Sequence, residues 1–387
     1  MTRALRLAYV TDQFLPSDGA DTIQLVSMTS AFAVAGHAVT LMPPAPRQSI
    51  PDAANVAAHY GVAPGFGWHP LPGPYPALFR GLEKLLHGWK AARYLRGREI
   101  DAVYTRNLPS LLAVLLLTGL PVFYETYRPW PAQSAAKSLL FRALARQRRF
   151  AGLILHSALA AGSYAPLGYD EARLLVAHNG INPRLFESAP SRQEARARFG
   201  FDPDKIIAVY AGHVSPTKGL GLVLDAAQRL PELEFVLAGS TGEGAIEQRA
   251  RGMGNVRVLG WQRPEAVIAL LAAADILIIP PTAAPLQRTG NTVLPLKTFQ
   301  YMAAGRAIVA PATPDVMEVL ADGSNARLVP PDEGESFVAV LRSLAADPAL
   351  RARLGAAGRD AALANSWQAR AERVAGFIRN RLASGAG

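Results

Sequence analysis

Residues 211–227, AGHVSPTKGLGLVLDAA, decide the fold of this chain. An apolar strand ends at Gly212, a short loop carries His213 and Lys218, and an apolar helical pattern begins after Gly219. Such a helix start can hold a phosphate group, because its unpaired amides carry partial positive charge, glycine permits close approach, and lysine adds a full charge. The alternative is an ordinary strand-to-helix turn with a solvated lysine. In either case, a strand that leads directly into a helix is typical of a parallel α/β sheet.

The same alternation continues in both directions from this stretch. Short apolar runs joined by helical patterns predict parallel sheets that helices cover on both faces. Before a polar segment near residues 183–204 we expect strands at RLAYVTD, AVTLM, DAVYTRN, VFYETY, GLILHS and RLLVAHNG. After it we expect strands at IIAVYAGH, LEFVLAGS, NVRVLGW, DILIIPPT, RAIVAPA and ARLVPP. A Pro/Gly-rich loop is expected after AVTLM, and a helix after Asp315.

The sequence therefore predicts an α/β chain with two Rossmann-like domains. The first spans residues 1–183, the second spans residues 205–365, and the polar segment 184–204 is the predicted linker. The Ala- and Arg-rich tail has a helical pattern. Its last part, residues 366–387, is predicted to be a helix that packs back toward the first domain through an apolar face.

Composition limits the classes of protein. Half of the 387 residues are hydrophobic and 18% are charged, which predicts large buried cores rather than disorder. The formal charge of +10 favours anionic partners such as phosphates, anionic lipid or nucleic acid. With no cysteine there is no disulfide, thiolate zinc site or cysteine nucleophile, and seven scattered histidines offer little for a metal cage. We expect no metal.

The chain carries no sign of an export signal or membrane span. Its start, MTRALRLAYVTD, passes directly into a strand pattern. The longest apolar run, residues 111–120, is shorter than the roughly 18–20 residues that a span needs, and is interpreted as a buried helix. We therefore expect a cytoplasmic protein.

A second informative segment is RTGNTVLPLKTFQYMAAGRAIVAP, residues 288–311. Thr292 can cap a helix, and Arg288 and Asn291 would then lie at its start, so that two helix starts could bind one ligand. The alternative is plain capping and a solvated arginine.

At this point the chain resembles the retaining glycosyltransferases of family 4, which have the GT-B fold of two facing Rossmann-like domains. The resemblance rests on AGHVSPTKG, PLKTFQYMAAGRAIVAP, VAHNGINPRLF, DAVYTRN with FYETY, NVRVLGW and the final SWQARAERV. It implies transfer of a sugar from a nucleotide-sugar to a glycan, lipid-linked or small-molecule acceptor, with retention and without a metal. The nucleotide-sugar is then a co-substrate, and no cofactor is expected.

The resemblance also implies roles for individual residues of the second domain. Lys218 and His213 would neutralise the donor diphosphate, and His213 is the weaker choice because imidazole is mostly neutral at pH 7. The family's pair of glutamates, eight positions apart, falls on Thr292 and Gln300, so both carboxylates are missing. The full set of predicted donor-binding residues is Gly212, Lys218, Gly219, Trp261, Arg288, Gly290, Asn291, Thr292 and Gln300.

In the first domain, candidate residues follow three expected strands. The loop TDQFLPSDGAD places Asp18, Gly19 and Ala20 at the next helix start, where glycine allows close approach of a phosphate or sugar. Predicted catalytic residues are Glu125 and Tyr127 in FYETYRPW, together with Lys218 and His213. Further acceptor-side candidates are Arg106 and Asn107, which could equally serve as hydrogen-bonding loop residues.

The basic stretch from Lys137 to Phe150 could lie on anionic lipid, which would place the protein at the inner face of the membrane. A solvated helix with one core face gives the same pattern. Nucleic acid is not an expected partner, because the basic charge is spread along the chain. Two other functions remain open: a nucleotide-sugar epimerase or phosphorylase on the same fold, and a non-catalytic nucleotide-sugar-binding relative.

Overall fold

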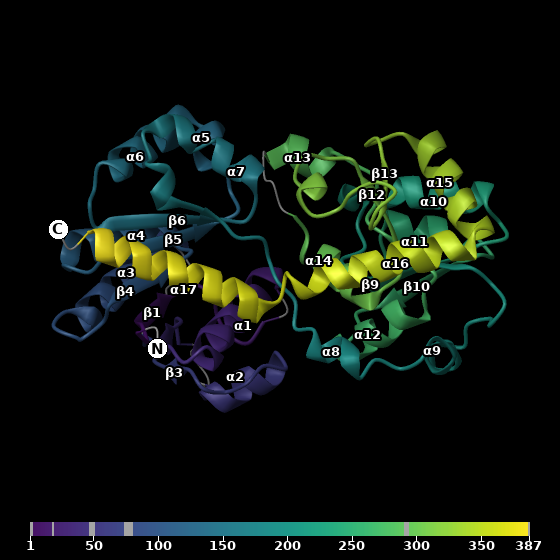
Figure 1. The fold of residues 1–387 in the computed structure, drawn as a ribbon. Coiled ribbons are helices and arrows are strands. Elements are labelled where there is room, and N and C mark those ends of the chain that lie inside the picture. Colours follow the sequence, from purple (N-terminus) through teal and green to yellow (C-terminus); the bar gives the residue numbers. More distant parts are fainter. Residues whose placement is uncertain (1–2, 18, 46–50, 73–79, 290–293, 386–387) are drawn as a thin grey trace. The chain divides into compact units, whose positions relative to one another are not determined.

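The computed structural model describes residues 3–17, 19–45, 51–72, 80–289 and 294–385. The chain forms two compact units (Figure 1). Unit 1 comprises residues 1–179 and 367–387, and unit 2 comprises residues 180–366.

Unit 1 is built on a parallel sheet with seven strands among the described residues, in the order β3-β2-β1-β4-β5-β6-β7. The strands are β1 (Arg6–Val10), β2 (Ala38–Met42), β3 (Gly67–Trp68), β4 (Ala102–Thr105), β5 (Val122–Thr126), β6 (Phe150–Leu155) and β7 (Leu174–Val176). The helices are α1 (Ala20–Val34), α2 (Ala53–His59), α3 (Arg80–Leu95), α4 (Leu108–Leu117), α5 (Trp130–Gln133), α6 (Ala135–Ala145), α7 (Ala158–Gly162) and α17 (Trp367–Ser384), with short 3₁₀ turns at Ala165–Leu167 and Glu171–Arg173. Strands β4, β5 and β6 are buried along their whole length, because helices cover both faces of the sheet.

Unit 2 repeats this plan with a parallel sheet in the order β10-β9-β8-β11-β12-β13. Its strands are β8 (Ile207–Ala211), β9 (Glu234–Ser240), β10 (Val256–Gly260), β11 (Ile276–Ile278), β12 (Ala307–Pro311) and β13 (Arg327–Val329). Its helices are α8 (Arg184–Glu187), α9 (Arg192–Phe199), α10 (Leu220–Arg229), α11 (Ala245–Ala250), α12 (Pro264–Ala273), α13 (Ala284–Thr289), α14 (Leu296–Ala304), α15 (Gly334–Ala346) and α16 (Pro348–Leu363), with 3₁₀ turns η3 (Pro216–Lys218) and η4 (Val316–Glu318). Two parallel-sheet Rossmann-like domains with a C-terminal helical tail are thereby confirmed.

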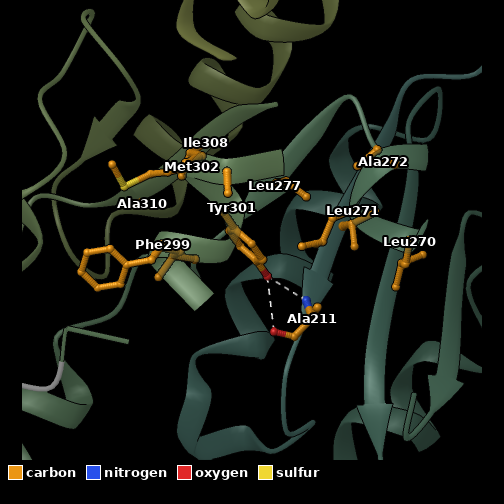
Figure 2. Close-up of a cluster of buried hydrophobic side chains, with 14 of the residues drawn as sticks. Ala211, Leu270, Leu271, Ala272, Leu277, Phe299, Tyr301, Met302, Ile308 and Ala310 are labelled. Carbon is orange, nitrogen blue, oxygen red and sulfur yellow. Dashed lines mark hydrogen bonds between the residues drawn. The ribbon is translucent and has the colours of Figure 1, made fainter. Parts of the chain in front are cut away.

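One half of the core of unit 2 fixes α14 against the sheet. Side chains of α12, β11, α14 and β12 form a buried cluster (Figure 2). Tyr301 of α14 lies within this cluster, and its hydroxyl accepts a hydrogen bond from the amide of Ala211 at 2.8 Å and donates to the carbonyl of the same residue at 3.4 Å. The position of α14 is therefore tied to the end of β8.

The C-terminal helix α17 belongs to unit 1, where it packs on α1 and β6. Figure 1 shows it in yellow beside α1. Its buried residues include Trp367, Arg370 and Val374. An ideal Cβ at Gly152 in β6 would lie 2.7 Å from the ring of Phe377, so the absence of a side chain on this strand lets the helix approach closely.

The predicted linker is the main correction. Residues 184–204 lie in unit 2 and contain α8 and α9. Helix α9 begins with a capping box of Ser191 and Glu194, and it packs on α12. The side chains that it buries are Ala195 and Arg196, so the hydrophobic periodicity that marks a packed helix is missing from its sequence.

Three smaller predictions also differ from the structure. The loop expected after AVTLM contains α2, whose first turn is capped by the side chain of Asp52. The helix expected after Asp315 is only the 3₁₀ turn η4. The run 111–120 does contribute to a helix, α4, but Leu116 is 81% exposed. Within the described ranges, none of the helices combines the length and apolar character that crossing a membrane requires.

Candidate functional site

The loop after β8 forms a glycine- and lysine-containing turn in unit 2. Gly212 has a φ of 150°, and its amide donates a hydrogen bond of 2.9 Å to the carbonyl of Ala238 in β9. Lys218 is the last residue of η3, and Gly219, with a φ of 75°, immediately precedes α10. The side chains of His213 and Lys218 are both exposed. These four residues therefore gather at the carboxyl end of β8.

The loop after β11 meets this turn. An ideal Cβ at Gly219 would lie 2.5 Å from Cγ2 of Thr282, so the two loops are in direct contact and this position requires glycine. Helix α13, which follows Thr282, contacts η3. Strands β8 and β11 are neighbours at the point where the strand order reverses, and ligands of open parallel sheets bind at such points.

Lys297 is a residue at this site that the sequence analysis does not single out. It lies in the first turn of α14, and its Nζ is 3.8 Å from the centroid of the Tyr210 ring. An ideal Cβ at Gly212 would overlap this ammonium group. Burial, assisted by the charge of Lys218, lowers the pKa of Lys297 to about 7. The spacing of four between Lys297 and Tyr301, which places both on one helix face, is the signal that could have revealed it.

Other predicted donor-binding residues are less closely associated with this turn. Gly290, Asn291 and Thr292 lie outside the described residues, and Arg288 is described only as part of α13, without its side chain. Gln300 is a half-buried residue of α14. Trp261 follows the edge strand β10, two strands away from β8, and is 52% exposed.

Unit 1 has a cavity of about 360 Å³ at the carboxyl ends of β1, β4 and β5. The polar and charged residues that line it include Asp12, Asp21, Lys84, Arg106, Asn107, Glu125, Tyr127 and Arg128. The structure thus brings together the predicted Arg106, Asn107, Glu125 and Tyr127. Gly19 and Ala20 lie at the start of α1 but are not among the residues that line this cavity, and Asp18 lies outside the described residues.

Glu125 is the centre of a buried polar network. Its side chain has no exposed surface, and its Oε1 accepts hydrogen bonds from Gln24 at 2.6 Å, His156 at 2.6 Å and Arg370 at 2.7 Å. Its Oε2 accepts a hydrogen bond from the hydroxyl of Tyr104 at 2.5 Å. The four partners come from α1, β4, the end of β6 and α17, so this carboxylate connects the sheet to two helices.

Charge and burial set the protonation of this network. Burial opposes the charge of Glu125, but the guanidinium of Arg370 and the hydrogen bond from His156 outweigh it and hold the pKa of Glu125 well below its usual range. Burial lowers the pKa of His156 to about 4. The imidazole is therefore neutral at pH 7, and its Nε2 carries the proton that it donates to Glu125.

Two predicted residues of unit 1 are held by neighbours, and a third lies among aromatic rings and an arginine. Arg106 donates from Nη2 to the carboxylate of Asp21 at 3.0 Å and from Nη1 to the side-chain oxygen of Gln24. Asn107 accepts a hydrogen bond from the amide of Ser110 at 2.8 Å and so caps α4. Tyr127 is half-buried, and Arg128 lies 5.4 Å from the centroid of its ring and 5.1 Å from that of Trp130.

In the described part of the chain, no three or more histidine, aspartate or glutamate side chains form a group suited to a metal ion.

Comparison with known proteins identifies the class of these two units. The family model described as "Glycosyl transferases group 1" matches residues 191–361, and "Glycosyltransferase Family 4" matches residues 22–185. Solved structures with the same fold include the HepE protein of Anabaena in complex with UDP, with a TM-score of 0.75 and 16% identity over 97% of this chain and 100% of that one. Sucrose-phosphate synthase of Thermosynechococcus elongatus has a TM-score of 0.76 and 18% identity over 98% of this chain and 100% of that one. The fold is GT-B.

The chain is also similar in sequence to two bacterial glycosyltransferases. The chain is 29% identical over 223 residues to a D-inositol 3-phosphate glycosyltransferase of Streptomyces avermitilis, and the match covers 53% of this chain but only 46% of that protein. It is 24% identical over 364 residues to a phosphatidyl-myo-inositol mannosyltransferase of Mycolicibacterium smegmatis, which covers 90% of this chain and 86% of that protein. With the two family models covering consecutive parts of its length, the chain belongs to the glycosyltransferases of family 4.

Proposed function

We propose that this chain transfers a sugar from a nucleotide-sugar to a glycan, lipid-linked or small-molecule acceptor. In this proposal unit 2 binds the nucleotide-sugar and the cavity of unit 1 binds the acceptor. The sugar keeps its anomeric configuration, and no metal is needed. The protein works in the cytoplasm.

The observation that carries the proposal is the turn of Gly212, Lys218 and Gly219 at the carboxyl end of β8. Both glycines adopt positive φ, with values of 150° and 75°, and the exposed Lys218 is separated from the start of α10 only by Gly219. A glycine-containing loop that combines a helix start with a lysine is suited to a diphosphate. The HepE structure contains UDP, so a uridine nucleotide is the first donor to test.

The chemistry asked of these residues is electrostatic. The bond between the anomeric carbon and the diphosphate oxygen breaks, a bond to the acceptor oxygen forms, and the acceptor's proton passes to the departing diphosphate. Lys218, His213 and the amides at the start of α10 stabilise the charge that develops on the diphosphate. In unit 1, Glu125 positions Gln24, which in turn holds Arg106 at the cavity wall.

A thermal-shift screen tests the first half of the proposal. The purified protein is mixed with UDP, GDP, TDP, ADP or CDP and with the corresponding sugars. A ligand at 100 times its dissociation constant adds about 2.7 kcal/mol to the free energy of unfolding, which is readily detected. Sugar transfer with the selected donor is then followed by product analysis with and without EDTA, and the anomeric configuration is read by NMR. A folded sample that no nucleotide stabilises would contradict the proposal.

One observation favours a second function, that of a non-catalytic nucleotide-sugar-binding protein. Gln300 is an amide at a position where the resemblance leads us to expect a carboxylate, and a neutral hydrogen bond is worth roughly 1 kcal/mol against 1.5–3 for one to a charged group. Such a protein would bind a nucleotide-sugar without turning it over. An epimerase would instead change the sugar without an acceptor, so product analysis separates all three functions.

We further propose peripheral contact with anionic lipid through the segment from Lys137 to Phe150. Helix α6 buries Phe141 and Leu144, while Leu139 is 68% exposed and Arg142 and Arg146 are also exposed. The end of the segment, Phe150, is a buried residue of β6 and cannot take part. Co-sedimentation with vesicles of anionic and of zwitterionic lipid tests this contact, and replacing Arg142 and Arg146 with glutamine should abolish any preference for the anionic vesicles.

A further inference from the structure

Lys297 has an amino group that no carboxylate among the described residues pairs with. Its ammonium lies against the face of the Tyr210 ring, with Nζ 3.8 Å from the centroid. Within the described ranges, no carboxylate forms an ion pair with it and no acceptor forms a hydrogen bond with it. Buried or half-buried polar groups in proteins usually have such a partner, because desolvation of an unpaired charge is costly.

The location of this ammonium is fixed by the fold. Tyr301, one turn further along α14, holds the backbone of Ala211 because its hydroxyl accepts a hydrogen bond from the amide and donates one to the carbonyl (Figure 2). Lys297 is four residues earlier and so lies on the same helix face. That face is directed at the end of β8, where the absence of a side chain on Gly212 leaves the space that Nζ occupies.

Two ammonium groups are therefore near one another at the same end of the sheet. Lys218 is exposed at the end of η3, and its charge lowers the pKa of Lys297, although burial is the larger cause. Among the described residues, no carboxylate lowers the cost of this arrangement by raising the pKa of Lys297, so two lysines placed in this way are electrostatically unfavourable until an anion enters the site. The start of α10, which follows this turn, adds backbone amides that can donate hydrogen bonds to such an anion.

We propose that Lys297, together with Lys218, binds the diphosphate of the nucleotide-sugar as a second cationic ligand. This inference rests on the proposed function of unit 2 and adds a residue and a ligand group to it. A nucleoside diphosphate carries two to three negative charges near neutral pH, which matches two ammonium groups better than a single carboxylate or a neutral sugar does. Lys297 would then bind the phosphates and would not distinguish one base from another.

The test compares Lys297→Met with the wild-type protein. Methionine has a similar length and removes the charge together with the N–H donors, and replacement of a buried charge by an apolar side chain of similar volume is often neutral or stabilising. The control is Lys205→Met, which removes an exposed lysine from the turn before β8, at the opposite end of that strand. Thermal unfolding of all three proteins checks that they fold.

Affinities for UDP, GDP, TDP, ADP and CDP are measured by titration calorimetry, and those for the corresponding nucleosides by ligand-observed NMR. For every diphosphate that the wild type binds, we expect Lys297→Met to weaken binding by about 10- to 100-fold, as for the loss of a charge-assisted contact. Nucleoside binding and the Lys205→Met variant should be unchanged. Lys297→Gln, which retains polarity without charge, should behave like Lys297→Met.

The outcomes separate the two proposals. If the wild-type protein binds none of the diphosphates, the proposed function fails and this inference fails with it. If the wild type binds one and Lys297→Met binds it equally well, only the role of Lys297 is overturned. An equal loss of affinity for the diphosphate and for its nucleoside would show that Lys297 shapes the pocket and does not recognise phosphate. That result would also overturn the inference.

Discussion

Arg370→Met should destabilise unit 1 strongly while leaving the cavity wall untouched. Arg370 has no exposed surface, and its guanidinium donates to Glu125 at 2.7 Å, to the carbonyl of His178 at 2.8 Å and to that of Ala177 at 3.1 Å. Its loss leaves a buried carboxylate without its cation and takes from two carbonyls the hydrogen bonds that Arg370 donates. Removal of one partner of a buried ion pair costs about 3–5 kcal/mol.

The structure also limits this magnitude. Nη1 of Arg370 has no hydrogen-bond partner among the described residues, so the arginine already carries a desolvation penalty of about 1–3 kcal/mol that the substitution relieves. Glu125 keeps the donors Gln24, Tyr104 and His156. We therefore expect a net loss near the lower end, about 3 kcal/mol.

Tryptophan fluorescence during urea unfolding measures this loss. Four of the five tryptophans, Trp68, Trp89, Trp130 and Trp367, are in unit 1, so the signal reports mainly on that unit. In a thermal scan the same loss corresponds to a decrease of about 6–12 °C in the melting temperature of unit 1. Arg373→Met, which replaces an exposed arginine on the same helix, is the matched control and should change stability by less than about 0.5 kcal/mol.

A double-mutant cycle tests whether Arg370 stabilises the protein through Glu125. Glu125→Gln removes the buried carboxylate, so in the Glu125→Gln/Arg370→Met protein no charge is left unpaired. We expect this double variant to be more stable than the sum of the single losses predicts, by about 1–3 kcal/mol. Additive losses, or a loss of less than about 0.5 kcal/mol for Arg370→Met alone, would refute the argument that Arg370 acts through Glu125.

Three further predictions concern both units. Lys218→Ala should lower turnover at least about tenfold, because it removes a cation from the departing diphosphate, and unchanged kinetics would exclude Lys218 from the site. Stability should decrease as pH falls from about 6.5 to 4, because the pKa of His156 is about 4 in the folded protein and about 6.5 when unfolded, so the unfolded chain takes up the proton first. The shift of His156 corresponds to about 3 kcal/mol, and His87, whose pKa burial also lowers to about 4, adds to the same loss. Urea midpoints that stay constant over this range would contradict the prediction. Gly239→Ala should destabilise unit 2 by about 1–3 kcal/mol and weaken nucleotide binding, because Gly239 has a φ of 110° and an added Cβ would overlap the carbonyl of Gly212. Gly221→Ala, where an added Cβ meets open space, is the control whose stability should not decrease.

Local sequence was sufficient to predict the candidate phosphate turn. Gly212, Lys218 and Gly219 lie within eight residues, and their order along a strand, loop and helix specifies where they come together. Lys297 lies in a helix that the sequence also predicts, but the direction of its side chain depends on which face of α14 packs on the sheet. The hydrogen bonds of Tyr301 determine that face, and a composition pattern does not reveal them.

Contacts between distant residues were not predictable in this way. Glu125 was expected at the cavity as a catalytic residue, whereas its partner Arg370 is 245 positions away, and no local spacing relates the two. The same limit explains the linker. Helix α9 packs through Arg196, which donates to the carboxylate of Asp275 at 2.6 Å and to the carbonyl of Ala273 at 3.1 Å. A method that searches for apolar periodicity passes over a helix whose buried side chain is charged.

Arg196 and Arg370 have the same role at the two places where the chain passes from one unit to the other. The chain passes from unit 1 to unit 2 after Asn179 and returns to unit 1 at Trp367. The first crossing is followed by the short helix α8 and then by α9, and the second is followed by α17. Each buries one arginine, Arg196 or Arg370, that is hydrogen-bonded both to a carboxylate and to backbone carbonyls of its own unit. An apolar stripe alone permits a helix to slide along a sheet, whereas several directional hydrogen bonds from one guanidinium fix both its register and its rotation. We infer that the arginines attach each crossing segment to one defined place. The substitution Arg196→Met should then destabilise unit 2 and leave the stability of unit 1 unchanged. Arg370→Met should destabilise unit 1 and leave the stability of unit 2 unchanged.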